Sequence, residues 1–222
     1  MALILSGMQE QRALRSLTYV DNELGRLTAE EISNMLFWPN PTHLETLRLG
    51  SLKTNNYSLA ILLSALKTNR KLICLDIEKI TLFNTKLFEY LSQFLKTNKM
   101  IKNLRLSWNG FFPKQIIGIM NLIKRRKTIQ YLDLSYNNLV SDKRSAYLVK
   151  DFVNTMRRFI LRTQIFHLNL EGMNMGKTVT KLVHSIKASS TLNCVHLDMN
   201  NVPAEIVYDM DCELSIPETY EV

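Results

Sequence analysis

The stretch IQYLDLSYNNL, residues 129–139, decides the fold, because its apolar residues fit neither a plain strand nor a plain helix. They stand at Ile129, Leu132, Leu134 and Leu139, and Asn137 lies between the last two. The same offsets recur in LRSLTYVDNEL (14–24) and in IKNLRLSWNGF (101–111). Three matches of this kind indicate a repeated structural unit rather than chance.

Four further stretches keep the apolar frame: LETLRLGSLKT (44–54), LICLDIEKITL (72–82), IFHLNLEGMNM (165–175) and LNCVHLDMNNV (192–202). The seven frames begin at residues 14, 44, 72, 101, 129, 165 and 192, so successive starts are 30, 28, 29, 28, 36 and 27 residues apart. A period of this size predicts a solenoid. We expect the turn asparagines to satisfy backbone groups that leave the strand ladder: Asn22, Asn109, Asn137 and Asn200.

The segments between the frames have a helical period. SLAILLSALKTN (58–69) and KLFEYLSQFLKTN (86–98) place apolar residues three and four positions apart. Each unit is therefore one strand and one helix, which predicts an α/β fold with parallel strands near 14–19, 44–49, 72–77, 101–106, 129–134, 165–170 and 192–197. The longer segment 141–163 predicts either a functional insertion or a longer helix that covers more core.

The frame resembles that of leucine-rich repeat proteins, in the long-repeat class typified by ribonuclease inhibitor. The resemblance implies a solenoid with a curved parallel sheet on its concave face and helices on its convex face. The family includes inhibitors, GTPase activators, actin-filament caps, innate-immune sensors and bacterial effectors. It implies protein binding, usually on the concave face, and no residue of this chain selects one member.

Composition limits the remaining possibilities. The chain has 222 residues, of which 46% are hydrophobic and 22% charged, enough to bury a substantial core. Three cysteines far apart in sequence favour a reducing compartment. The only apolar stretch near the start, ALIL, is too short for a signal peptide or a membrane span. We expect an intracellular, cytoplasmic protein.

Residues 1–202 form the expected solenoid of about seven repeats, and the two ends depart from the pattern. ILSGMQEQRAL (4–14) aligns without a gap on LLSALKTNRKL (62–72), so the chain begins in the middle of a repeat or forms a capping helix. In the first case another segment, domain or subunit would cover this end. Residues 203–222 contain six acidic and no basic residues, which predicts an acidic cap or tail.

The charge is strongly asymmetric. The chain carries a formal +8, and the −6 of residues 203–222 leaves +14 on residues 1–202. Part of this charge recurs near the expected helix ends and defines a basic ridge: Lys67, Lys96, Lys124, Arg125, Arg126 and Lys127. These cations either complement the helix macrodipoles or bind acidic protein, RNA or lipid headgroups. Because no aromatic side chains alternate with them, we do not expect nucleic acid to be the partner.

Side chains on the sheet face follow from the frame, since its third and fifth residues point away from the leucines. Exposed aromatic and arginine side chains on such a face are typical of binding hot spots. We therefore predict a protein-binding surface formed by Arg48, Arg105, Trp108, Tyr131, Asp133, Tyr136, Phe166, His167 and His196. The alternative for Trp108 and Phe166 is that they pack on neighbouring loops.

One group on this face has catalytic or metal-binding residue types. His167 and Cys194 share a column in adjacent units, and His196 lies beside them, so a Cys–His pair or a three-ligand metal site is conceivable. An open sheet offers neither an orienting group and oxyanion site nor a fourth ligand. We therefore expect no enzyme activity, cofactor or metal, and assign these residues to the binding face.

Two functions remain open. The first is a non-enzymatic protein–protein interaction module or scaffold, within a larger assembly or multidomain chain, that binds its partner on the concave face. The alternative is a regulatory accessory of an enzyme, such as a GTPase activator, or a bacterial effector that targets a host protein. Only the resemblance supports this alternative.

Overall fold

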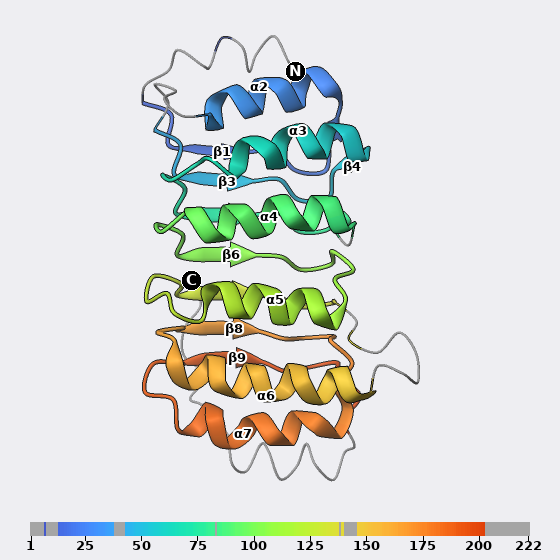
Figure 1. Cartoon of the computed structure of the whole chain (residues 1–222), viewed down its shortest axis with the longest axis vertical. Coiled ribbons are helices and arrows are strands. Elements are labelled where there is room, and N and C mark those ends of the chain that lie inside the picture. The colour runs from blue at the N-terminus through green and yellow to red at the C-terminus, as the bar shows by residue number, and fades with distance from the viewer. Residues whose placement is uncertain are drawn as a thin grey trace.

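The computed structural model describes residue 7 and residues 13–37, 43–82, 84–137, 139 and 146–202. These residues form an α/β structure with a seven-stranded parallel sheet and a layer of six α-helices (Figure 1). The strands of the main sheet, in spatial order, are β1 (Ser16–Thr18), β3 (Thr46–Arg48), β5 (Cys74–Asp76), β6 (Asn103–Arg105), β7 (Tyr131–Asp133), β8 (His167–Asn169) and β9 (Cys194–His196). A second, two-stranded sheet pairs β2 (Glu23–Leu24) with β4 (Lys53–Thr54).

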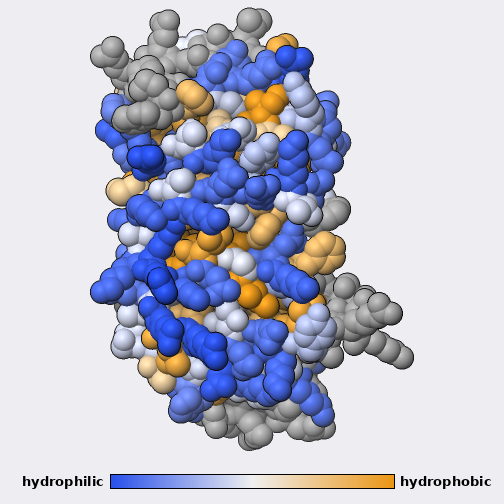
Figure 2. Space-filling model, in the orientation of Figure 1, coloured by the Kyte–Doolittle hydropathy of each residue, from blue (hydrophilic) through white to orange (hydrophobic). Residues whose placement is uncertain are grey.

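The helices lie in chain order on one side of the main sheet (Figure 1). They are α2 (Arg26–Leu36), α3 (Asn56–Leu66), α4 (Thr85–Thr97), α5 (Pro113–Ile123), α6 (Ala146–Arg162) and α7 (Thr180–Lys187), and the 3₁₀ helix η2 (Gly176–Val179) precedes α7. The outer surface of this layer is mostly hydrophilic, with apolar side chains visible between the helices (Figure 2). No described helix has the length and apolar character needed to cross a membrane.

The strand register confirms all seven predicted strands. The central residues of neighbouring strands face one another: Leu17, Leu47, Leu75, Leu104, Leu132, Leu168 and Val195. The strands are three residues long, shorter than predicted, although main-chain bonds continue beyond them, as from Leu49 N to the Asp76 oxygen at 2.7 Å. Because Leu104, Leu132 and Leu168 are fully buried, the apolar frame forms the core between sheet and helices.

The turn asparagines confirm the prediction at three of four positions. Asn137 is buried; its amide group donates to the carbonyls of Leu106 at 3.0 Å and Leu134 at 2.9 Å. Its oxygen accepts the main-chain N–H groups of Asn109 at 3.2 Å and Phe111 at 3.1 Å, which belong to the preceding unit. Asn109 and Asn200 make corresponding bonds.

The prediction holds only in part for Asn22, which is exposed and whose side chain donates to one backbone group, the nearby Val20 carbonyl at 2.6 Å. At this turn the chain enters the β2–β4 pair, and the main-chain oxygen of Asn22 accepts from Lys53 N at 2.9 Å. At this turn the β2–β4 backbone bond therefore takes the place of the hydrogen bonds that a buried asparagine amide makes in the other units.

Two other asparagines, in the Lys-Thr-Asn sequences, connect a helix end to the next frame. Asn98 is buried, and its side-chain oxygen accepts from Met100 N at 2.8 Å and Ile101 N at 2.9 Å. Asn69 accepts in the same way from Lys71 N and Leu72 N, both at 2.9 Å. These bonds fix the chain direction as it leaves the helix, so each frame begins in register with its neighbours.

The longest of the described helices, α6, has 17 residues and covers the core, as one of the two sequence interpretations predicts. Phe152, Met156 and Phe159 are buried on its inner face, whereas Tyr147 is 59% exposed. The predicted half repeat in residues 1–10 and the acidic segment 203–222 lie outside the described residues, apart from Gly7.

Candidate functional site

The candidate site lies on the sheet face opposite the helices, which we call the open face. On most strands the middle residue is buried, while the first and third residues lie more exposed. The register confirms the two predicted columns of side chains. One contains Ser16, Thr46, Cys74, Asn103, Tyr131, His167 and Cys194, and the other contains Thr18, Arg48, Asp76, Arg105, Asp133, Asn169 and His196.

Five side chains from β5, β6, β7, β8 and β9 form a continuous line of contacts, which we call the central row: Asp76, Arg105, Tyr131, His167 and His196. Arg105 Nη1 lies 3.6 Å from Asp76 Oδ2, and the Arg105 guanidinium carbon is 5.1 Å from the centre of the Tyr131 ring. The Tyr131 and His167 ring centres are 4.6 Å apart, and the His167 and His196 ring centres are 4.9 Å apart. A cation, a phenol and two imidazoles are thus held side by side.

Burial and neighbouring charges shift the protonation of this row. Burial raises the pKa of Asp76, the negative charge of Glu78 raises it further, and Arg105 opposes the rise. Burial also raises the pKa of Tyr131, with a further contribution from Asp133. The pKa of His167 is lowered, first by burial and then by His196. The row therefore favours a neutral imidazole at His167.

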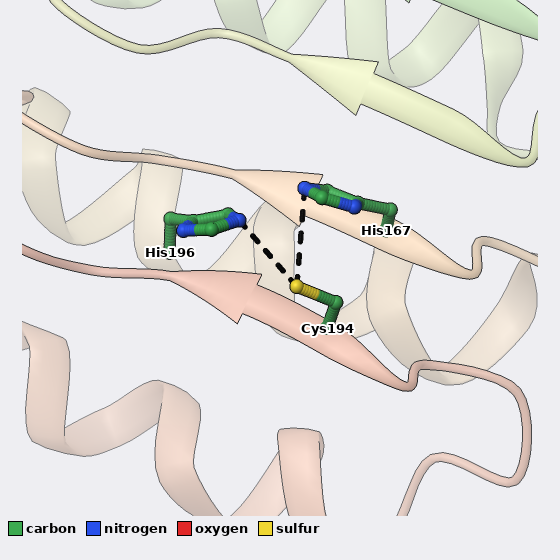
Figure 3. Close-up of side chains that lie close together, drawn as sticks. All are labelled: His167, Cys194 and His196. Carbon is green, nitrogen blue, oxygen red and sulfur yellow. Dashed lines mark hydrogen bonds between the residues drawn. The ribbon is translucent and has the colours of Figure 1, made fainter. Parts of the chain in front are cut away.

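Cys194 lies beside both histidines (Figure 3). Its Sγ is 3.4 Å from His196 Nε2 and 3.9 Å from His167 Nε2. Burial raises the pKa of the Cys194 thiol. A lowered pKa favours a nucleophilic cysteine, and burial acts in the opposite direction at this thiol.

A second group lies where β6 and β7 end, and we call it the edge stack: Trp108 and Tyr136. Their ring centres are 4.2 Å apart and the planes differ by 11°. Both residues have a left-handed backbone with φ of 55°, and Trp108 is 54% exposed. The Tyr136 hydroxyl donates to Glu171 and lies 3.5 Å from Met199 Sδ. Its bond to Glu171 raises the pKa of Tyr136.

Two of the three remaining predicted binding residues border the central row, and the third lies apart. Arg48 is exposed on β3 and faces Asp76 of the row in the parallel register. Phe166 is 51% exposed but precedes β8, at the edge of the sheet opposite the edge stack. Asp133 is only 7% exposed: its Oδ1 accepts from the Ser135 N–H at 2.9 Å and the Ser135 hydroxyl at 2.6 Å, and its Oδ2 lies 3.5 Å from the Tyr131 hydroxyl, so it borders the central row.

The basic ridge lies at the C-terminal ends of the helices. Lys67 caps α3, Lys96 lies in the last turn of α4 and Lys124 caps α5. Arg126 is half-buried and donates to the Asn98 carbonyl, and burial lowers its pKa. Since this guanidinium binds a carbonyl at a helix end, it has the role that the macrodipole interpretation gives these cations. Arg125 and Lys127 are exposed.

Sequence reasoning missed the residues that support the edge stack. Gly172 has φ of +62°, and a Cβ atom there would lie 2.5 Å from Tyr136 Cδ1, so the Tyr136 ring occupies the space that a side chain would need. The missed signal is positional: Trp108, Tyr136 and Gly172 all stand at the eighth position of their frames, where the backbone is left-handed. A glycine at this position leaves room for a large neighbour.

Comparisons with known proteins give a likeness of fold. No model of a known protein family matches the chain, and no curated protein matches it in sequence. Among solved structures, the actin-binding site 2 (ABS2) of leiomodin-1 is similar, with a TM-score of 0.55 and 16% sequence identity. The match covers 72% of this chain and 88% of that one. At this identity the likeness concerns the fold alone.

Proposed function

We propose that the chain is a leucine-rich-repeat solenoid of the ribonuclease-inhibitor-like class that acts as a non-enzymatic protein-binding module. Seven strands in a single register, with six described helices packed beside them, support the first part of the proposal. Neighbouring strands in a sheet lie about 4.8 Å apart, whereas packed helices need about 8–10 Å. That difference favours a sheet that curves, with the helices outside and the open face on the concave side.

The central row is the observation that carries the protein-binding proposal. Arginine and aromatic side chains contribute more than other types to protein interfaces. Arg105, Tyr131 and His167 already contact one another, so they lose less side-chain freedom when a partner docks. The edge stack adds an exposed Trp108 at the border of the same face. A partner with apolar groups and carboxylates would complement this combination of rings and guanidinium groups.

Two further observations agree with the proposal. The raised pKa of Cys194 argues against a thiolate nucleophile at the one Cys–His group on the described part of the open face. Cys74 and Cys194 are both free thiols, which agrees with an intracellular, cytoplasmic location. The similar region of leiomodin-1 is an actin-binding site, so actin is one protein to include in binding experiments, although a likeness of fold does not select it.

Affinity capture with quantitative mass spectrometry tests the proposal. Trp108→Ala and Tyr131→Ala should each lose the captured partner, and with the purified partner each should weaken binding by about 1–4 kcal/mol. The matched control is Tyr57→Ala, because Tyr57 is a 60% exposed aromatic on α3 in the helix layer. This control should bind like the wild type.

A double variant in the basic ridge tests the competing possibility, that the partner docks at the helix ends. Lys124→Glu with Arg125→Glu should mainly slow association and change its salt dependence if these charges lie at the rim of the interface. If both aromatic variants bind normally while this double variant loses binding at every salt concentration, the partner docks at the helix ends and the open-face proposal is wrong.

A further inference from the structure

His167, Cys194 and His196 place three potential metal-ligand atoms within 4.8 Å of one another, and they are the only such group among the described residues (Figure 3). We propose that these residues bind one Zn²⁺ ion, with two imidazole nitrogens and one thiolate as protein ligands and the fourth position taken by water. The proposal concerns the isolated chain and does not depend on the protein-binding proposal.

The two sulfur–nitrogen distances are close to those of tetrahedral coordination, and the two imidazole nitrogens, which lie within 4.8 Å of each other, would have to be about 3.3 Å apart. With Zn–N bonds of about 2.05 Å and a Zn–S bond of about 2.3 Å, tetrahedral angles put the sulfur about 3.5 Å from each nitrogen. Cys194 Sγ is 3.4 Å from His196 Nε2 and 3.9 Å from His167 Nε2. A movement of a few tenths of an ångström at His167 would therefore bring both sulfur–nitrogen distances to about 3.5 Å.

The site stands on strands, which hold it more rigidly than loops would. His167 on β8 faces Cys194 on β9 in the parallel register, and Cys194 and His196 are two residues apart on the same face of β9. The His167 ring lies between the Tyr131 and His196 rings, at centre distances of 4.6 Å and 4.9 Å. The strand register thus brings the three ligand side chains together, and the ring contacts restrict the movement of His167.

The donor set selects the class of metal. Imidazole nitrogen and cysteine sulfur suit Zn²⁺ and similar ions, whereas Ca²⁺ and Mg²⁺ require oxygen ligands. Burial keeps the Cys194 thiol protonated in the metal-free chain. On binding, the zinc–sulfur bond replaces the thiol S–H bond, and the proton is released to the solvent.

The sequence offers no fourth protein ligand for a metal, and this is the argument against a metal in the sequence analysis. The geometry allows a site without one. Three protein ligands and a water are a common arrangement for zinc in sites that are open to solvent. All three residues are half-buried, so one side of the site faces the solvent and a water molecule can reach the ion.

Cobalt substitution in the reduced, full-length chain is the direct test. Co²⁺ should bind at one ion per chain and produce the near-ultraviolet sulfur-to-cobalt charge-transfer band that reports a thiolate ligand. One equivalent of Zn²⁺ should abolish this band, and Zn²⁺ alone should raise the melting temperature, since the ion binds the folded state. His167→Gln and His196→Gln should each weaken binding about tenfold or more.

The matched variants are Cys194→Ser and Cys74→Ser. Cys74 lies in the same side-chain column and is also a half-buried free thiol, but it stands on β5, away from both histidines. Cys194→Ser should lose the band and Cys74→Ser should retain it. Absence of the band in the wild type, or its persistence in Cys194→Ser, overturns the proposal. Circular dichroism of the metal-free variants checks that each one is folded.

Discussion

The Trp108 and Tyr136 rings stack with their centres 4.2 Å apart, and each residue has a left-handed backbone with φ of 55°. The two residues occupy the same frame position in successive units, so the period of the fold places the rings together. The stack does not continue in the next unit, where Gly172 leaves space and Glu171 binds the Tyr136 hydroxyl. The edge stack therefore has one exposed end, at Trp108.

A double-mutant cycle should detect the stack as a coupling energy. Trp108→Ala, Tyr136→Ala and the double variant should give a coupling of about 0.5–1.5 kcal/mol in urea unfolding, the value found for aromatic pairs beyond their area burial. Trp108→Ala combined with Tyr57→Ala is the control, because Tyr57 lies on α3 in the helix layer. If both cycles are additive, the ring contact contributes nothing to stability.

Gly172→Ala should destabilise the protein through two separable effects. The new Cβ would lie 2.5 Å from Tyr136 Cδ1, and φ of +62° is strained for alanine. We expect a loss of about 1–3 kcal/mol in the free energy of unfolding. Gly176→Ala is the matched control, since Gly176 has φ of +54° but no atom within 4 Å of the new Cβ.

The difference between these two glycine variants measures the contact with the Tyr136 ring. It should shrink when Gly172→Ala is combined with Tyr136→Ala, because the ring is then gone. A Gly172→Ala loss no larger than that of Gly176→Ala would mean that the ring moves aside without cost.

The leucine frame sufficed to predict the seven strands, their register and both side-chain columns of the open face. This works because each frame residue has a fixed direction relative to the core, so Leu132 inside implies Tyr131 outside. The frame carries no information about hydrogen bonds between side chains. Asp133 is buried and accepts two bonds from Ser135, and the spacing of the leucines does not predict these bonds.

Convergence in space was harder to predict than exposure. Phe166 and Trp108 are each about half exposed, as the binding-face prediction requires, yet they lie at opposite edges of the sheet. The Cys194–His196 distance of 3.4 Å likewise depends on side-chain torsions, which the sequence does not specify. Residue type and column identified the candidates, and only the three-dimensional arrangement distinguished a compact cluster from separate residues.

Asn137→Ala should be among the most destabilising polar substitutions in the described part of the chain. It would remove bonds to two buried carbonyls and two buried N–H groups, some of which belong to the preceding unit. We expect a loss of about 3 kcal/mol or more, since each unsatisfied buried group costs about 1–3 kcal/mol.

Asn22→Ala is the control for this prediction, because Asn22 is exposed and its side chain donates only to the Val20 carbonyl of its own turn. It should change the free energy of unfolding by about 0.5 kcal/mol or less. Urea unfolding of both variants measures the difference. Equal losses would show that the buried amide has no special role in holding neighbouring units together.

Asp76 should make stability fall as pH rises through the weakly acidic range. Its pKa is raised in the folded protein, first by burial and then by Glu78, whereas in the unfolded chain it lies near the ordinary value of about 3.9. Between these two pKa values the folded state keeps a proton that the unfolded state has lost. The linkage relation then requires the free energy of unfolding to decrease with increasing pH in this window and to level off above the raised pKa.

Asp76→Asn isolates this effect, because the amide keeps the shape of the carboxyl group and cannot ionise. Relative to the wild type, the variant should gain stability as pH rises above about 4 and reach a constant difference once Asp76 is fully ionised in both states. Glu78→Gln removes one cause of the raised pKa of Asp76, so it should narrow the pH range over which stability falls. The measurement is urea unfolding of the three proteins across this pH range at constant ionic strength. A difference between Asp76→Asn and wild type that stays constant would show that Arg105 balances burial at this carboxyl group, and one that falls with rising pH would show that Arg105 outweighs burial.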